Sequence, residues 1–169
     1  MKIESLRDLF EFKLRCAYDC EQKLAKKGIP GMIKGASSPE LRQALEQHLE
    51  ETRSHVTRLE KVFQAIGVEA ETEDNDVIDE MIDGAEDAIS DIDASPLRDA
   101  ALIVGGNGVE HYEMALYGSL LAFAQQLGIA DAENLLQQTL QEEKAADAKL
   151  TAIGEKNVNP QAAGERRAA

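Results

Sequence analysis

Apolar residues recur every three or four positions along most of the chain, which is the spacing of one face of an α-helix. This pattern runs through four long stretches, residues 6–24, 41–66, 103–121 and 136–150. A shorter amphipathic stretch, residues 77–89, lies between the second and the third. No stretch alternates convincingly with the period of two that is typical of a strand. The sequence therefore predicts an all-α protein.

Short local signals mark where these helices begin and end. Ser38 and Ser95 each precede a proline, a pair that caps and begins many helices. Gly67 and Gly128 occupy positions where a left-handed residue usually ends a helix. Asp131 is expected to cap the last long helix.

The apolar period is lost after about Asn157. We therefore expect one helical domain over residues 1–158 and a disordered tail over residues 159–169.

The four predicted helices are joined in an informative way. The first two and the last two are separated by short loops, which make antiparallel neighbours, whereas about thirty residues connect Gly67 to Ser95. Two helical hairpins joined by one long crossover are typical of the ferritin-like four-helix bundle, here with an extra short helix in the crossover between helices 2 and 3.

Charge narrows the range of partners. The 169 residues contain 18 Lys and Arg against 32 Asp and Glu, a formal net charge of −14. Such an acidic protein is a poor match for nucleic acid or an anionic membrane, both of which require a basic surface. No segment resembles a signal peptide or a membrane span, and two cysteines cannot form a disulfide framework. We expect a cytoplasmic protein.

Acidic residues occupy positions in the helical stripes where a bundle should be apolar. An unpaired buried carboxylate costs several kcal/mol, so one such acid is usually half-exposed, but here all four stripes carry them. The residues are Glu21 in the first helix, Glu51 and His55 in the second, Glu110 and Glu113 in the third, and Glu143 and Asp147 in the fourth.

Two pairs of these glutamates have the same separation of 30 residues: Glu21 with Glu51, and Glu113 with Glu143. Residues equidistant from the turn of a helical hairpin lie at one height, and the midpoints here are Ala36 and Gly128, at the two predicted turns. The spacing therefore predicts one level layer of carboxylates. It also requires the first helix to continue, kinked, past Pro30 to about Ala36.

Carboxylates with an imidazole suit a pair of iron or manganese ions, and the sequence does not choose between the two metals. The expected ligands of two metal ions per chain are Glu21, Glu51, His55, Glu110, Glu113, Glu143 and Asp147. Glu110 is also expected to act catalytically as a proton carrier. His48 is expected to lie away from the acids, and the alternative for the whole set is an ordinary charged face.

Other side chains near the expected site have simpler explanations. Tyr18, Tyr112 and Tyr117 are expected to pack, with a hydrogen bond to a metal ligand as the alternative. Cys16 and Cys20 are expected to be small buried thiols, with a redox role as the alternative.

Four blocks of the sequence together resemble the YciF/YciE-type bacterial stress proteins, over roughly residues 3–158. The blocks are Tyr18-Asp19-x-Glu21-x-Lys23-Leu24, His48-Leu49-Glu50-Glu51-Thr52-Arg53-x-His55-Val56, Val109-Glu110-His111-Tyr112-Glu113 and Glu142-Glu143-Lys144-Ala145-Ala146-Asp147. The resemblance implies a ferritin-like homodimer with a dinuclear metal site and a role in stress. Manganese catalase-like activity has been ascribed to some relatives.

The expected function is that of a non-haem dinuclear oxidoreductase acting on peroxide or dioxygen, of catalase or peroxidase type, with ferroxidase activity left open. The alternative is a metal-independent helical stress scaffold that binds a protein partner.

Overall fold

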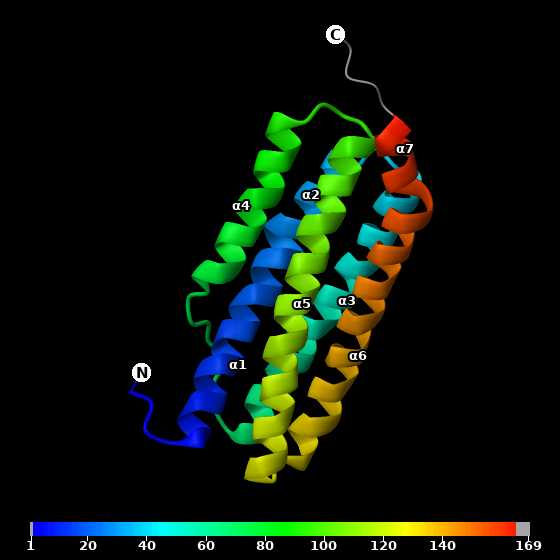
Figure 1. Ribbon diagram of the computed structural model, residues 1–169. Coiled ribbons are helices and arrows are strands. Elements are labelled where there is room, and N and C mark those ends of the chain that lie inside the picture. The colour runs from blue at the N-terminus through cyan, green and yellow to red at the C-terminus, as the bar shows by residue number, and fades with distance from the viewer. Residues whose placement is uncertain (1, 165–169) are drawn as a thin grey trace.

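The computed structural model describes residues 2–164, and all regular secondary structure in that range is helical. The four long helices are α1 (Leu6–Lys23), α3 (Pro39–Ile66), α5 (Pro96–Leu127) and α6 (Ala130–Ile153). They form a bundle in which α3 runs antiparallel to α1 and α6 antiparallel to α5 (Figure 1). This confirms the ferritin-like four-helix bundle. No helix within the described range has both the length and the apolar character needed to cross a membrane.

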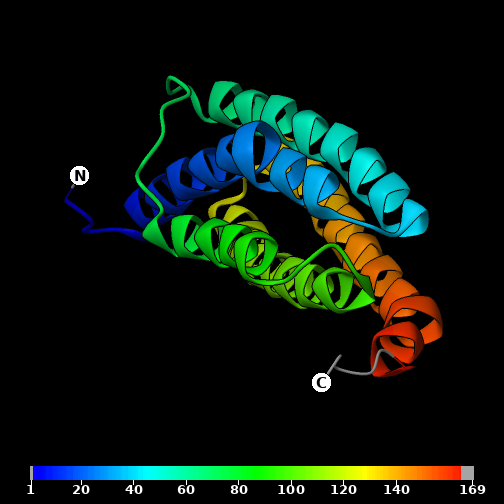
Figure 2. The same ribbon diagram turned by 90° about the horizontal axis from the view of Figure 1, so that it is seen from above.

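The long crossover returns the chain to the end of the bundle where α3 began. It contains α4 (Asp76–Asp91), which packs on the outside of the bundle against α5 and α2 (Figures 1 and 2). Ile78 and Ile82 are the buried residues of α4. The predicted extra helix is therefore confirmed, and it covers one side of the bundle.

The first helix continues beyond Lys23, as the spacing of the glutamates required. It passes through a π-helical turn, η1 (Leu24–Gly28), into α2 (Ile29–Gly35), and Ala36 is the C-cap. Pro30 lies in the first turn of α2. A π-turn adds one residue to a helical turn. The chain therefore remains helical through Pro30, although this residue has no N–H to donate.

Most of the predicted helix ends are confirmed. The Ser38 and Ser95 hydroxyls accept hydrogen bonds from the backbone N–H groups of Leu41 and Arg98, both at 3.3 Å. Gly67 and Gly128 end α3 and α5 with φ angles of 75° and 68°, in the left-handed region.

The prediction that Asp131 caps α6 is wrong. Helix α6 begins at Ala130, and Ile129 is its N-cap, so Asp131 lies within the first turn. A negative charge at this position interacts favourably with the positive end of the helix dipole.

The chain stays helical where the sequence predicts a tail. After α6 it continues as a second π-helical turn, η2 (Gly154–Val158), and α7 (Asn159–Gly164). Val158 is buried and α7 packs against α5. These contacts hold the segment in place although its sequence lacks the apolar period of an amphipathic helix. Residues 159–164 are therefore not the disordered segment that was expected, and residues 165–169 lie outside the described range.

The hydrophobic core is divided into two clusters. One contains residues such as Leu24, Leu45, Leu102 and Leu150. The other contains residues such as Phe10, Phe63, Leu120 and Leu136. Most of the acids and histidines of the sequence stripes are buried between the two clusters, so the fold positions a polar layer inside an aliphatic core.

A buried aspartate joins the two halves of the fold at one end of the bundle. The two carboxylate oxygens of Asp99 on α5 accept hydrogen bonds from the backbone N–H groups of Ser37 and Ser38, both at 2.7 Å. These residues form the turn between α2 and α3, and Asp99 is only 2% exposed. The turn that joins α2 to α3 in the first hairpin is therefore held in place by α5 of the second hairpin.

Replacing Asp99 with alanine would leave two backbone donors without their charged partner. We expect Asp99→Ala to lower the free energy of unfolding by about 3 kcal/mol, measured by urea denaturation. Asp91→Ala removes an exposed aspartate at the end of α4 and should change it little. Equal effects of the two substitutions would contradict this role.

Candidate metal centre

A layer of buried acids and imidazoles crosses the middle of the bundle. All four long helices contribute to it, and its members are 0–7% exposed. They are Glu21 from α1, His48 and His55 from α3, Glu110 and Glu113 from α5, and Glu143 from α6. Five of the seven predicted ligands thus lie together in this layer, which contains the two groups described next.

The first group consists of Glu21, His55 and Glu143, whose nearest ligand atoms lie within 4.8 Å of one another. The Nδ1 atom of His55 is 3.3 Å from Oε1 of Glu21 and 3.0 Å from Oε1 of Glu143. Three donors from three different helices therefore converge on one position.

The second group consists of His48, Glu110, Glu113 and Glu143, within the same 4.8 Å limit. The Nε2 atom of His48 is 3.1 Å from Oε1 of Glu110 and 4.0 Å from Oε2 of Glu143. Glu143 belongs to both groups and offers a different oxygen to each imidazole. This is the arrangement expected of a carboxylate that bridges two metal ions.

A carboxylate outside the layer orients His55. The Nε2 atom of His55 lies 2.8 Å from Oε2 of Glu142, and Arg58 donates two hydrogen bonds to the same carboxylate, at 2.6 and 2.9 Å. When Nε2–H donates to Glu142, the neutral ring presents its Nδ1 lone pair to Glu21 and Glu143. Carboxylates commonly orient metal-binding histidines in this way.

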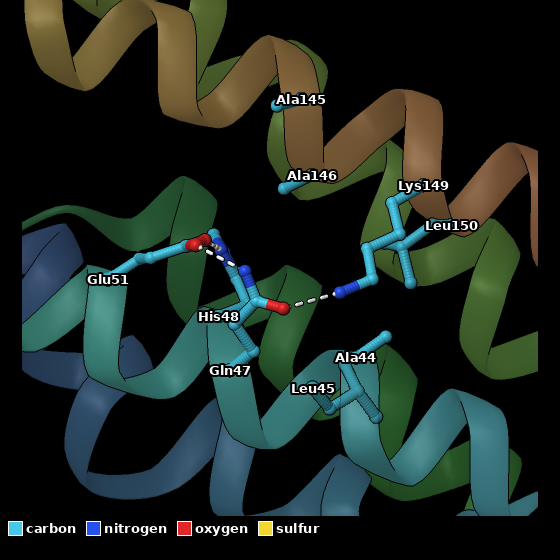
Figure 3. Close-up of a pocket in the computed structure, with 9 residues that line it drawn as sticks. All are labelled: Ala44, Leu45, Gln47, His48, Glu51, Ala145, Ala146, Lys149 and Leu150. Atoms are coloured by element: carbon cyan, nitrogen blue, oxygen red, sulfur yellow. Dashed lines mark hydrogen bonds and ion pairs between the residues drawn. The ribbon is translucent and has the colours of Figure 1, made fainter.

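His48 has a similar but looser arrangement. Its Nδ1 atom is 3.5 Å from Oε2 of Glu51, and Glu51 also accepts a hydrogen bond from Gln47 at 2.9 Å. Figure 3 shows these three side chains next to one another on α3. A proton on Nδ1 would face Glu51, which leaves the Nε2 lone pair directed toward Glu110.

Two further side chains contact the acids of the layer. The hydroxyl of the buried Tyr117 donates to Oε1 of Glu21 at 2.5 Å, so this tyrosine makes the hydrogen bond that was the alternative to simple packing. The thiol of Cys20 lies 3.6 Å from Oε1 of Glu113. Cys16 and Cys20 are both buried free thiols, as expected.

The carboxylates alter the proton affinity of the two imidazoles. Burial lowers the pKa of His48, but hydrogen bonds to Glu110 and Glu51 outweigh it and raise the pKa to about 10. Burial likewise opposes protonation of His55, and the negative charges of Glu21 and Glu143 raise its pKa to about 11. Without another cation, protons on the imidazoles neutralise part of the layer.

Two carboxyl groups also retain protons more strongly than usual. Burial raises the pKa of Glu113 well above its ordinary value, and repulsion from Glu143 and Glu21 adds to the effect. Burial raises the pKa of Glu143 to about 7, although the neighbouring His55 imidazole acts in the opposite direction. A cation that binds here must displace such protons.

The layer contains more acceptor atoms than the described residues satisfy. Oε2 of Glu21, Oε2 of Glu110 and both carboxylate oxygens of Glu143 are buried without a hydrogen-bond partner. Buried polar atoms normally have partners, so this set requires an explanation. Four carboxylates carry four negative charges when ionised, which equals the charge of two divalent cations. The donor set therefore fits a pair of metal ions.

A third group of acids, Asp74, Asp76 and Asp79, provides a contrast. Lys23 lies between two of them, with its Nζ atom 3.0 Å from Asp74 and 2.6 Å from Asp79. Burial lowers the pKa of Lys23, but hydrogen bonds to Asp19, Asp79 and Asp74 outweigh it and raise the pKa. This group is on the surface and has its own counter-charge.

Glu51 and Asp147 were predicted as ligands, and the structure does not bring either into the layer. Glu51 is about 60° around α3 from His48, at about 100° per residue, so its side chain lies at the boundary with α6 and is 32% exposed. Asp147 lies one turn beyond Glu143 with a 22% exposed side chain, and its Oδ1 atom is 3.3 Å from Nε2 of His111.

His48 was expected to lie away from the acids, and that expectation is wrong. It is seven residues from His55, which places the two rings only about 20° apart around the helix. The seven-residue spacing was the available signal. It was missed because the prediction assumed one level layer, whereas the two groups occupy different heights along α3.

The comparisons with known proteins agree with the fold and with the sequence resemblance. Residues 5–163 match the family described as a domain of unknown function, DUF892. Protein YciF of Escherichia coli strain K12 is 35% identical over 163 residues, which cover 96% of this chain and 98% of that protein.

Two solved structures are also similar. The E. coli stress protein YciF has a TM-score of 0.88 at 35% identity, with 93% of this chain and 99% of that chain covered. YcfI from Rhodopseudomonas palustris has a TM-score of 0.87 at 38% identity, with 90% and 96% covered. The chain therefore belongs to the DUF892 family and is a relative of the stress protein YciF.

Proposed function

We propose that the chain is a dinuclear non-haem metal protein that binds iron or manganese and acts on peroxide or dioxygen. The observation that carries the proposal is Glu143, a fully buried carboxylate shared by two donor groups, with neither oxygen hydrogen-bonded. A fixed bridging carboxylate is the feature that distinguishes a dinuclear centre from two unrelated buried acids.

The ligand assignment follows the two groups. Glu21 and His55 would hold one ion, and His48, Glu110 and Glu113 would hold the other, with Glu143 between them. Glutamate oxygens and imidazole nitrogens are a donor set that iron and manganese both accept. Two bound ions would supply the electrons and the Lewis acidity needed to reduce or split an O–O bond.

The remaining residues control orientation and proton transfer. Glu142, held by Arg58, fixes the ring of His55, and Tyr117 fixes one oxygen of Glu21. Glu110 has one oxygen beside His48 and one without a partner, which supports a role for its carboxyl group in carrying a proton to or from a small molecule in the layer. The two hydrophobic clusters exclude bulk water from both sides.

The alternative is a metal-independent scaffold. It is favoured by the description of the Rhodopseudomonas palustris relative as a candidate structural protein. Metal content distinguishes the two, because a scaffold has no need of bound ions.

The first prediction concerns metal stoichiometry. Protein purified without chelator and loaded with ferrous iron or manganese should contain two ions per chain, measured by elemental analysis. Glu143→Gln removes a ligand from both groups and should abolish most binding and peroxide turnover, whereas Glu21→Gln affects one group and should leave about one ion. Glu46→Gln, an exposed change on α3, is the control. Wild-type protein that binds neither metal would support the alternative of a metal-independent scaffold.

A second prediction concerns the carboxylate that orients His55. Glu142→Gln keeps the size of the side chain but weakens its bonds to His55 and Arg58, so metal affinity should fall by about 10–100-fold in a competition titration. Glu50→Gln is the matched control, because Glu50 is an exposed glutamate on α3 that pairs only with Arg53 among the described ion pairs. An unchanged affinity in Glu142→Gln would show that this contact does not tune the centre.

A third prediction concerns stability. A metal that binds the folded chain alone should stabilise it by about 2.7 kcal/mol per site at one hundred times its Kd. We therefore expect saturating iron or manganese to raise the melting temperature of the wild-type protein, measured by differential scanning calorimetry. The rise should nearly vanish in Glu143→Gln. Magnesium, which prefers an all-oxygen shell with several waters, should have much less effect.

A further inference from the structure

A pocket of about 60 Å³ lies between α3 and α6 and leads inward to His48 (Figure 3). Its walls are mostly small or aliphatic side chains, and its polar residues other than the buried His48 are near the surface. The lining residues are Ala44, Leu45, Gln47, His48, Glu51, Ala145, Ala146, Lys149 and Leu150. The pocket thus connects solvent to an imidazole of the candidate centre.

A smaller cavity of about 20 Å³ continues inward from the same place. It shares Leu45, His48 and Leu150 with the outer pocket and also contacts Glu110 and Gly106. At Gly106 a Cβ atom would come within 2.9 Å of Cδ1 of Leu150, so the glycine leaves room for that leucine beside the cavity. Two adjacent compartments that share three lining residues therefore lie between the surface and Glu110.

A polar contact crosses the outer pocket. Nζ of Lys149 on α6 donates to Oε1 of Gln47 on α3 at 2.7 Å (Figure 3). On the same side of the pocket, Glu51 bonds to Gln47 and lies beside His48. Lys149 and Glu51 put one charge of each sign on the pocket lining, and most of the other lining side chains are aliphatic. This lining suits a small uncharged molecule better than a hydrated divalent cation.

We propose that this pocket is the entry port of the candidate centre for a small neutral oxidant of the hydrogen peroxide class. The proposal rests on the proposed function and names its substrate class. A space of about 60 Å³ holds only a few water-sized molecules, so it admits hydrogen peroxide and rejects a hydroperoxide that carries an aromatic ring. Lys149 and Gln47 narrow the entrance, and Leu45 and Leu150 separate the port from the inner cavity.

Two substitutions with opposite effects test the port. Ala146→Leu replaces a methyl group in the pocket wall with an isobutyl group and should slow entry, whereas Lys149→Ala removes the side chain that crosses the pocket and should speed entry. Ala148→Leu and Lys144→Ala make the same two changes at exposed positions of α6 outside the pocket and should have no effect. Each variant is first checked for metal content and melting temperature.

Entry is measured in two ways. The first is the association rate of nitric oxide, a small neutral probe, with ferrous-loaded protein, followed by stopped-flow absorbance. The second is consumption of hydrogen peroxide and of cumene hydroperoxide. We expect Ala146→Leu to lower the nitric oxide rate and peroxide kcat/KM by about tenfold, and Lys149→Ala to raise the rate for cumene hydroperoxide most.

The two proposals fail in different ways. Wild-type protein without bound metal would overturn the dinuclear centre, and the port with it. Variants that keep two ions per chain but show wild-type rates with both probes would overturn the port alone. If Ala146→Leu does not fold, the test rests on Lys149→Ala. The port is contradicted if Lys149→Ala consumes cumene hydroperoxide no faster than the control Lys144→Ala does.

Discussion

The burial of four carboxylates at the centre of an aliphatic bundle is the constraint on which the rest of the structure depends. Glu21, Glu110, Glu113 and Glu143 are nearly inaccessible to solvent. Among the ion pairs of the described residues, Glu21, Glu110 and Glu143 pair only with His48 and His55, and Glu113 has no such pair. Like charges in a low-dielectric interior repel strongly, so the layer needs protons or cations to be stable. The two hydrophobic clusters supply the burial energy that keeps it closed.

Contacts lead outward from the buried Glu143 to side chains that are partly exposed. The imidazoles contact the inner carboxylates, Glu142 and Glu51 contact the outer nitrogens of the imidazoles, and Arg58 and Gln47 hold those outer acids. Each outer side chain fixes the orientation of the side chain that it contacts nearer to the centre of the layer. Side chains held in this way keep donor positions constant when an ion enters or leaves, which reduces the reorganisation that binding requires.

Much of the fold could be predicted from the sequence because the signals are local. The apolar period, the Ser-Pro starts and the glycines at 67 and 128 define the four helices and their turns. The equal spacing of the glutamates correctly required helix beyond Pro30. The tail was mispredicted because Val158 and α7 are ordered by contacts with the bundle, which no local period reveals.

The sequence predicted the chemistry of the candidate site better than it predicted which residues lie in the site. Which acids point inward depends on rotation around each helix, and a 60° difference separates Glu51 at the boundary from His48 in the layer. The contact of Glu142 with His55 joins α6 to α3, so it depends on how two helices pack rather than on spacing within one.

The link between Asp99 and the turn at Ser37 and Ser38 has a consequence for the order of folding. The backbone donors of that turn stay unpaired until α5 is present, and α5 follows in the chain only after α3 and the entire crossover. During synthesis the first hairpin therefore leaves the ribosome before its own turn can be completed. The two hairpins should fold as one cooperative unit rather than as successive halves.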